Sequence, residues 1–142
     1  MIKLKDLIKE MEGDDIEYVS PEETDVDYYN DLNRIEIESG LYIYPWKHLS
    51  VLAIKNGKCV GALYEGIIHN TFSFDVIVDK AERRKGIGAK LIDAGINDYK
   101  EISDSGIELE LKVVNAHLIP HLEKRGLKIV EKHAGHIIMK FI

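Results

Sequence analysis

The sequence predicts a single α/β domain (α+β in arrangement) built on a mixed, mostly antiparallel sheet of about six to seven strands flanked by helices. Two patterns predict this class. Three consecutive β-rich segments are separated by tight turns, which indicates an antiparallel meander. Beyond residue 86 the helical and strand periodicities alternate, which predicts one parallel crossover from the third strand of the meander to the fourth. A length of 142 residues is typical of one domain.

The composition is that of a globular protein. Hydrophobic residues make up 45% of the chain and charged residues 31%, too apolar a balance for intrinsic disorder. The apolar runs, such as residues 76–78 and 137–139, fall far short of the ~20 residues that span a bilayer. Residues 1–7 alternate charged with apolar side chains, unlike a signal peptide, so we expect a cytoplasmic protein. The single cysteine, Cys59, is expected to be a small hydrophobic residue in a strand.

The first 40 residues predict two helical regions and a short strand. Residues 4–11 place apolar side chains at helical spacing, and Gly13 ends that helix. Residues 15–19 form a brief strand. The Ser-Pro-Glu-Glu sequence at 20–23 then supplies a helix cap, a first-position proline and acidic first-turn residues. This second helical stretch, with one break allowed, ends near Gly40.

The three strands of the meander cover residues 49–54, 58–68 and 71–78. The first two are joined by Asn-Gly at 56–57, the preferred dipeptide of a two-residue hairpin. The His-Asn pair at 69–70 separates the second from the third. We therefore expect three neighbouring antiparallel strands.

The C-terminal part returns to alternating helices and strands. Residues 86–101 carry apolar side chains on one helical face, and residues 108–113 alternate strictly, as a half-exposed strand does. Asn115 is predicted to cap a helix over residues 116–125, which Gly126 ends. The last elements are two strands, residues 127–132 and 136–142, joined by a turn at 133–135.

Charge is distributed unevenly. The net charge is -6, but residues 1–45 carry 4 basic and 13 acidic side chains, whereas residues 46–142 carry 15 basic and 12 acidic ones. Nine carboxylates lie between Glu12 and Asp31 without a Lys or Arg. This acidic segment is either a solvated face or an attractor of cations. A nucleic-acid partner is disfavoured, since phosphate binding needs basic stripes.

The most specific local pattern is a strand that runs into a basic turn and then a helix. Gly86 and Gly88 lack the β-carbons that would keep a phosphate from the backbone, and the amides of a first helical turn favour anions. The basic run 83–85 adds positive charge. A Walker loop is excluded because Gly-Lys-Ser/Thr is absent, and a dinucleotide fingerprint lacks its third glycine. The alternative is a solvated basic turn before a helix.

This turn resembles the acetyl-CoA motif Q/R-x-x-G-x-G/A of the GNAT superfamily of acetyl-CoA-dependent N-acetyltransferases, which Arg83, Gly86 and Gly88 match. The second family pattern, N-x-x-A-I-x-x-Y-x-K-x-G-F, follows the next strand. It is matched at Asn115, Ile119, Lys124 and Gly126, with Leu127 in place of the final aromatic residue.

The resemblance covers residues 49–142 closely and residues 1–48 by layout only. It implies that residues 49–142 form the acetyl-CoA-binding core and that the acidic residues 1–48 form the acceptor side. It also implies that the third strand splays from the fourth, at residues 107–113, to admit the pantetheine arm. One backbone amide there would polarise the thioester carbonyl, and the pyrophosphate would lie on the backbone of residues 84–88.

Asn115 would contact pantetheine or cap the following helix, and both roles remain open. No metal is expected, because the spacing of the histidines suits none. The implied acetyl-CoA-binding residues are Val76, Val78, Arg83, Arg84, Lys85, Gly86, Ile87, Gly88 and Asn115.

A carboxylate usually removes the proton of the acceptor amine in such a transfer. Glu110 is the first candidate, because ribosomal-protein N-terminal acetyltransferases, a branch that this stretch resembles, place a glutamate five residues before the asparagine. The alternative is that Glu110 is an ordinary exposed strand carboxylate. Glu65 and Asp75 are weaker candidates for the base.

The proton donor for the leaving thiolate departs from the family pattern. The usual tyrosine is Leu122 here, which cannot donate a proton. We predict His121 beside it as the acid, with His117 one turn earlier as the other imidazole and water as the remaining source. Tyr42 and Tyr44, with Trp46, either border the acceptor cleft or cover the sheet edge.

The sequence therefore predicts an N-acetyltransferase that moves an acetyl group from acetyl-CoA to a primary amine. The acceptor is a small molecule or a peptide, and the acidic segment favours a cationic one: a polyamine, an aminoglycoside, a lysine side chain or a protein N-terminus. No nucleic acid or membrane partner is expected, and the assembly state is left open between a monomer and a homodimer. The alternative is a non-catalytic acyl-CoA-binding or regulatory module.

Overall fold

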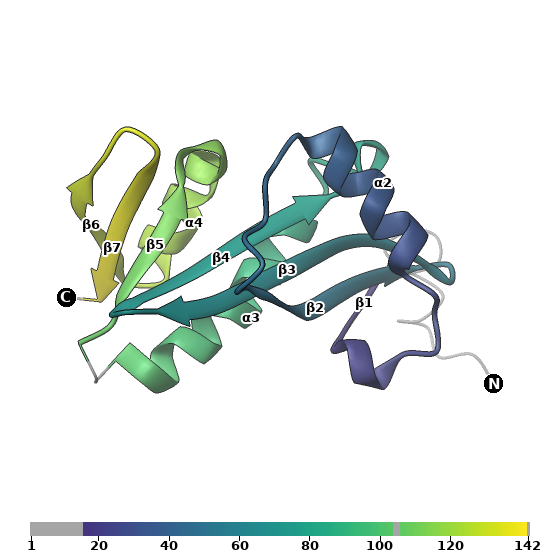
Figure 1. Cartoon of the computed structure of the whole chain (residues 1–142), viewed down its shortest axis with the longest axis horizontal. Coiled ribbons are helices and arrows are strands. Elements are labelled where there is room, and N and C mark those ends of the chain that lie inside the picture. The colour runs from purple at the N-terminus through teal and green to yellow at the C-terminus, as the bar shows by residue number, and fades with distance from the viewer. Residues whose placement is uncertain (1–15, 104–105, 142) are drawn as a thin grey trace.

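The computed structural model describes residues 16–103 and 106–141 (Figure 1). Within these ranges the strands form one seven-stranded sheet in the order β1-β2-β3-β4-β5-β7-β6, which confirms the predicted class. All neighbours are antiparallel except β4 and β5, which form the predicted parallel pair. The strands are β1 (Ile16–Val19), β2 (His48–Lys55), β3 (Lys58–Ile68), β4 (Thr71–Val78), β5 (Glu108–Lys112), β6 (Leu127–Lys132) and β7 (His136–Phe141).

Helices lie on both faces of the sheet, with α2 on one face and α3 on the other (Figure 1). Ile35 of α2 packs on Leu52 and Ile77, whereas α3 packs on the side chains that point the other way, including Phe74. Strand β4 is consequently buried on both faces. The helices are α2 (Tyr29–Ser39), α3 (Ile87–Ile102) and α4 (Ile119–Lys124), and the 3-10 helices are η1 (Pro21–Glu23), η2 (Lys80–Glu82) and η4 (Val113–Leu118).

Local signals for turns and helix ends were predicted correctly. Asn56 and Gly57 have φ values of 51° and 74°, the left-handed pair that a tight hairpin requires. Gly40 has a φ of 65° and ends α2 with its N–H bonded to the carbonyl of Glu36. Cys59 is buried in β3, as expected.

Of the two predicted helix caps, Ser20 occupies the N-cap position of η1 without a capping side-chain bond, and Asn115 is not a cap. Ser20 does not cap η1 with its side chain, because its hydroxyl donates instead to the Glu23 carboxylate at 2.7 Å. Asn115 does not begin a helix, because η4 starts two residues earlier, after Lys112, and places Asn115 in its interior.

The helix predicted over residues 4–11 lies outside the described residues. No helix in the described part of the chain is long and apolar enough to cross a membrane.

Strands β4 and β5 pair over four residues and then separate. The paired residues are Thr71–Phe74 and Glu108–Leu111, but β4 continues to Val78. Strand β5 ends at Lys112 and gives way to η4. This confirms the predicted splay and leaves the second half of β4 without a partner on that edge.

The close contact between β3 and β4 generates a test of stability. A β-carbon at Gly61 would lie 3.0 Å from the carbonyl oxygen of Ile77, a backbone atom fixed by the ladder. We expect Gly61→Ala to lower the free energy of unfolding by ~1–3 kcal/mol in urea denaturation, the usual effect of overpacking. Gly135→Ala is the matched control, since its β-carbon would meet nothing within 4 Å. Equal stability of the two variants would contradict the packing argument.

Candidate functional site

The basic turn after β4 presents an anion-binding backbone at the start of α3. Gly86 precedes the helix with a φ of 80°, and Arg84 has a φ of 69°. The first helical hydrogen bond runs from Lys90 N–H to Gly86 O at 3.1 Å, so the amides of residues 87–89 are left for a ligand. A β-carbon at Gly86 would meet no atom within 4 Å, so the approach to these amides is open.

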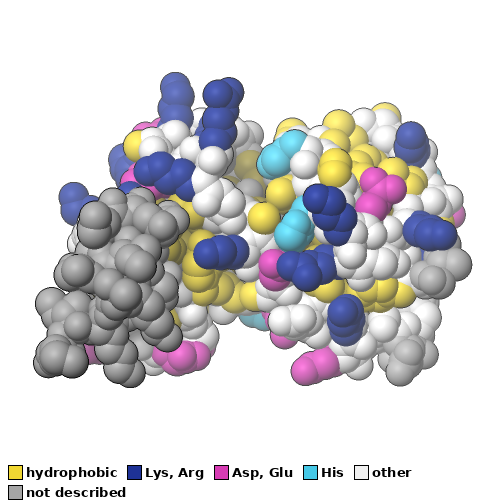
Figure 2. All heavy atoms as spheres, turned by 180° about the vertical axis from the view of Figure 1, so that it is seen from behind, with side chains coloured by type: hydrophobic (Ala, Val, Ile, Leu, Met, Phe, Trp, Pro, Cys, Tyr) yellow, Lys and Arg dark blue, Asp and Glu magenta, His cyan; other side chains and the backbone are white. Residues whose placement is uncertain are grey.

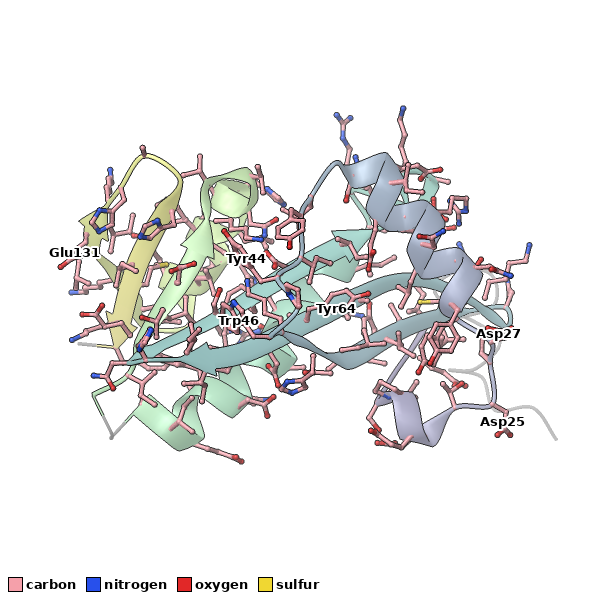
Figure 3. The ribbon with its side chains drawn as sticks, viewed as in Figure 1. Asp25, Asp27, Tyr44, Trp46, Tyr64 and Glu131 are labelled. Carbon is pink, nitrogen blue, oxygen red and sulfur yellow. The ribbon has the colours of Figure 1, made fainter. Side chains whose placement is uncertain are left out.

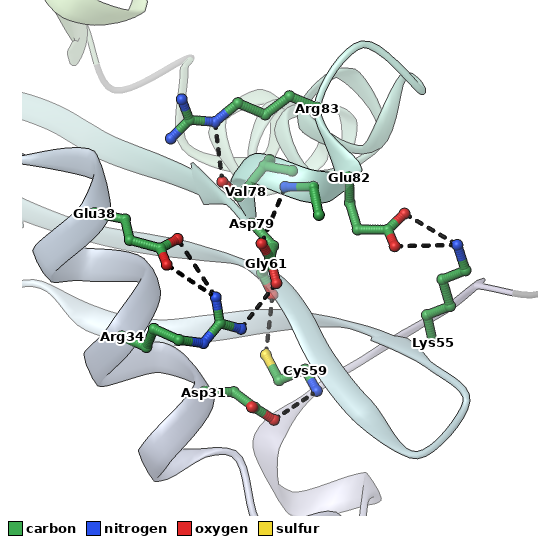
Figure 4. Close-up of polar contacts among 11 residues, drawn as sticks. Asp31, Arg34, Glu38, Lys55, Cys59, Gly61, Val78, Asp79, Glu82 and Arg83 are labelled. Carbon is green, nitrogen blue, oxygen red and sulfur yellow. Dashed lines mark hydrogen bonds and ion pairs between the residues drawn. The ribbon is translucent and has the colours of Figure 1, made fainter.

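Ion pairs hold this turn against both neighbouring elements (Figure 4). Arg34 of α2 contacts the Asp79 carboxylate at 2.8 Å, and this contact lowers the pKa of Asp79. Glu82 pairs with Lys55 of β2 at 3.0 Å and with Lys85 at 2.9 Å, and hydrogen bonds from these lysines lower the pKa of Glu82 despite its partial burial. The turn is therefore fixed to α2 and β2.

A cavity of about 520 Å³ extends from this turn along β4 to η4. Figure 2 shows a hollow at the upper edge of the molecule with Lys and Arg side chains on one side and hydrophobic side chains and a histidine on the other. Of the nine predicted cofactor-binding residues, only Lys85 is absent from the lining of this first cavity. The eight that line it are Val76, Val78, Arg83, Arg84, Gly86, Ile87, Gly88 and Asn115.

The backbone groups of Val76 and Val78 point toward the gap left by β5. Asp79 N–H bonds to Val60 O at 2.8 Å, and hydrogen-bonded pairs alternate along an antiparallel ladder. Val76 and Val78 are therefore non-hydrogen-bonded to β3, and their N–H and C=O groups face the open edge. Arg83 Nε already donates to Val78 O at 3.2 Å (Figure 4).

Asn115 supplies an unpartnered donor beside the first cavity. The residue is only 5% exposed, and its Nδ2 has no hydrogen-bond partner among the described residues. A buried amide without a partner is costly, and a ligand carbonyl would remove that cost. This orphaned donor and the open helix start fit an extended ligand with amide and phosphate groups.

A second cavity of about 480 Å³ adjoins the first, since Leu41 and Val114 line both. Glu110 lies in this second cavity, half-buried, and no hydrogen bond to its carboxylate is found among the described residues. Tyr42 and Tyr44 also line it, whereas Trp46 lines neither cavity. The other lining residues are Lys112, Val113, Ala134, Gly135 and His136.

A buried charge cluster, which we call the Asp75 cluster, consists of Lys47, Asp75 and Lys112. The side chains of Lys47 and Asp75 are both 0% exposed, and Lys47 Nζ lies 2.8 Å from Asp75 Oδ2. Lys112 Nζ lies 3.1 Å from the same oxygen and also donates to the carbonyl of Tyr42. Burial lowers the pKa of Lys47, although Asp75 opposes this. The Asp75 cluster thus ties the loop after α2 to both β4 and β5.

Aromatic rings cover this cluster. The Tyr44 and Trp46 rings are stacked with centroids 6.0 Å apart (Figure 3), and Lys112 Nζ lies 4.7 Å from the Tyr44 centroid. Sequence reasoning missed Lys47 and Lys112. The signal that was available is Asp75 itself, a carboxylate within an apolar strand that needs a cationic partner.

The two predicted catalytic residues are not brought together. His121 Nε2 contacts Asp93 at 2.7 Å, Arg125 pairs with the same carboxylate at 3.0 Å, and His121 is absent from the lining of both cavities. Leu122 is fully buried in the core. His117, in contrast, lines the first cavity.

Glu65, a weaker candidate base, faces α3 and lies outside both cavities. Burial raises the pKa of Glu65 to about 8, and the nearby carboxylate of Asp98 contributes to this rise. In the part of the chain that the structure describes, its Oε2 has no hydrogen-bond partner. Glu65 therefore belongs to the packing of β3 against α3.

The described part of the acidic segment lies near β1, at the opposite edge of the sheet from β6. In Figure 3, Asp25 and Asp27 lie at the far end of the molecule from Tyr44. Asp31 has a structural partner, since its carboxylate accepts the N–H of Cys59 at 3.1 Å (Figure 4). Glu110 is the acidic residue placed in the second cavity.

Comparison with known proteins identifies the fold. The model of the acetyltransferase (GNAT) family matches residues 7–127. The ribosomal-protein-S18-alanine N-acetyltransferase from Escherichia coli is 19% identical, with a TM-score of 0.59 over 87% of this chain and 91% of that one. An N-acetyltransferase from Staphylococcus aureus Mu50 is 16% identical, with a TM-score of 0.62 over 88% and 96%.

The PaiA N-acetyltransferase from Thermoplasma acidophilum, solved in complex with coenzyme A, is 17% identical, with a TM-score of 0.57 over 90% of this chain and 99% of that one. No curated protein matches the chain by sequence. At these identities the solved structures show a shared fold.

The environment of Glu65 predicts a pH dependence of stability. In the unfolded chain Glu65 ionises near its ordinary pKa of 4.5, whereas the folded protein keeps it protonated up to about pH 8. The unfolded state therefore binds fewer protons between these values, and stability falls as the pH rises. Glutamine does not ionise, so Glu65→Gln avoids this loss of stability. The loss amounts to about 1.4 kcal/mol for each unit by which the pKa of Glu65 differs between the folded and unfolded states.

We expect the stability of Glu65→Gln relative to the parent to increase from pH 5 to pH 8 in urea denaturation. Glu17→Gln, at an exposed position of β1, is the matched control and should show a constant difference. A constant difference for Glu65→Gln as well would contradict the raised pKa.

Proposed function

Because the chain belongs to the acetyltransferase (GNAT) family, we propose that it transfers an acetyl group from acetyl-CoA to a primary amine held in the second cavity. One observation carries this proposal. Eight of the nine predicted cofactor-binding residues line one cavity, and the predicted base lies in the cavity that adjoins it. Such an arrangement suits direct transfer between two ligands bound together.

In this proposal acetyl-CoA supplies the acetyl thioester and occupies the first cavity. Its pyrophosphate lies on the amides of residues 84–88 at the start of α3. The pantetheine amides pair with the free backbone edge of Val76 and Val78. Asn115 donates its unpartnered Nδ2 to the same arm.

Two groups of the chain then act on the reacting atoms. Glu110 takes the proton of the amine, because it is the carboxylate of the second cavity and accepts no hydrogen bond from the described residues. The N–H of Val76, which faces the gap, stabilises the oxyanion that forms when the amine attacks the thioester.

A cationic acceptor is the substrate class that we propose. Glu110 attracts an ammonium group, and the exposed ring of Tyr42 offers a face for cation–π contact. Polyamines, aminoglycosides, lysine side chains and protein N-termini all present such a group. The name of the Escherichia coli neighbour refers to an N-terminal alanine, so a peptide with that terminus belongs in the assay panel.

The assignment of the pyrophosphate site to residues 84–88 can be tested by measuring coenzyme A binding. A valine at Gly86 would be strained by its φ of +80° and would disturb the turn, so we expect Gly86→Val to abolish binding in isothermal titration calorimetry. Gly57→Val is the matched control, because Gly57 has a φ of +74° and equally open surroundings but lies in the β2–β3 hairpin. The control should lose stability and still bind. Undiminished binding by Gly86→Val would overturn the assignment.

The base can be tested by steady-state kinetics on a panel of amines. We expect Glu110→Gln to lower kcat/KM by ~10²–10⁴-fold for the best amine, the range typical of a lost general base, without changing coenzyme A affinity. Glu131→Gln, on β6 and outside both cavities, is the control. If the parent binds coenzyme A but acetylates no amine, the protein is the alternative acyl-CoA-binding module.

A further inference from the structure

The leaving thiolate of the proposed reaction needs a proton, and no helix residue at the expected place supplies one. Leu122 is fully buried in the core. His121 is held by Asp93, which Arg125 also contacts, outside both cavities. The proton donors that remain among the described residues lining the cavities include His117 at the first cavity and Lys112 at the gap between β4 and β5.

The first position beyond the paired residues of β4 and β5 is occupied by an ion pair. Backbone pairing ends at Phe74 and Leu111, so the next residues along the two strands are Asp75 and Lys112. Their side chains join the strands instead, with Lys112 Nζ 3.1 Å from Asp75 Oδ2. The Lys112 ammonium thus lies where the gap opens.

This ammonium is next to the proposed oxyanion site. Val76 follows Asp75 directly, and one strand residue advances the chain by ~3.3 Å. A thioester whose oxygen accepts the Val76 N–H is therefore held next to the residue that Lys112 contacts.

We propose, on the basis of the function proposed above, that Lys112 donates the proton to the leaving thiolate of coenzyme A. The ammonium of the acceptor first loses one proton to solvent. The neutral amine nitrogen then bonds to the carbonyl carbon and gives its second proton to Glu110. The C–S bond then breaks, its electron pair goes to sulfur, and sulfur takes a proton from Lys112. One proton passing from Glu110 to Lys112 through solvent restores both groups.

The surroundings of Lys112 suit this role. Its side chain is 15% exposed and lines the second cavity, whereas Lys47 is sealed from solvent. Asp75 Oδ2 and the Tyr42 carbonyl hold two of its three N–H donors, which leaves one for the thiolate. The charged and titratable groups that face it are Lys47 of the loop, Asp75 of β4, Glu110 of β5, Tyr44 of the loop and His136 of β7.

Two substitutions separate proton transfer from charge and packing. Lys112→Met removes the ammonium and keeps the length of the side chain, so kcat should fall by ~10²–10⁴-fold with little change in the affinity for acetyl-CoA. Lys112→Arg keeps the positive charge and can still contact Asp75, but a guanidinium does not give up a proton in proteins. The kcat of Lys112→Arg should therefore be as low as that of Lys112→Met. Kinetics, calorimetry and thermal melting would be measured for each.

The inference is overturned if Lys112→Met keeps the parental kcat, or if Lys112→Arg restores it. His117→Ala tests the imidazole at the first cavity, and a loss of kcat there with a full rate in Lys112→Met would overturn the inference and assign the proton to His117. If Lys112→Met does not fold, the Lys112→Arg result decides. Failure of the proposed function is distinguishable, since the parent itself would then acetylate no amine.

Discussion

The site depends on the separation of β4 from β5 after a short parallel pairing. Four residues of each strand are paired, and the second half of β4 then has a free backbone edge. Buried N–H and C=O groups need partners, so a strand can keep such an edge only where a ligand or a side chain satisfies it. Arg83 does so at the Val78 carbonyl, and the remaining groups face the first cavity. The antiparallel pairing of β4 with β3 holds the strand in place while its other edge stays open.

The Asp75 cluster holds the loop after α2 against β4 and β5 at this opening, and the burial of its charges costs free energy. Removing Lys47 and Asp75 from water is unfavourable, and breaking such a pair typically costs a further ~3–5 kcal/mol because one charge is left alone. The bond from Lys112 to the Tyr42 carbonyl also fixes the loop that carries Leu41, which lines both cavities. The same charges therefore hold the loop after α2 in place beside the second cavity.

The sequence predicted those features that short-range rules determine. Gly40 and the Asn56-Gly57 pair need left-handed backbone, and the alternation of β5 follows from a half-exposed strand. The Asn115 cap failed because capping preference cannot decide where a 3-10 helix begins. The burial of Lys47 was not predictable, since its partner Asp75 lies 28 residues away and only the folded sheet brings them together.

A proton donor on β5 is also better fixed than one on α4 in this chain. Helix α4 is six residues long, and Leu118 and Leu122, four residues apart, both turn into the core. Packing thus occupies the helix position where the family places its tyrosine. On β5, Leu109 and Leu111 are buried in the core and the alternating positions 110 and 112 share the opposite face, where both line the second cavity. The period of the strand therefore places a carboxylate and an ammonium side by side, and the ladder with β7 holds their spacing.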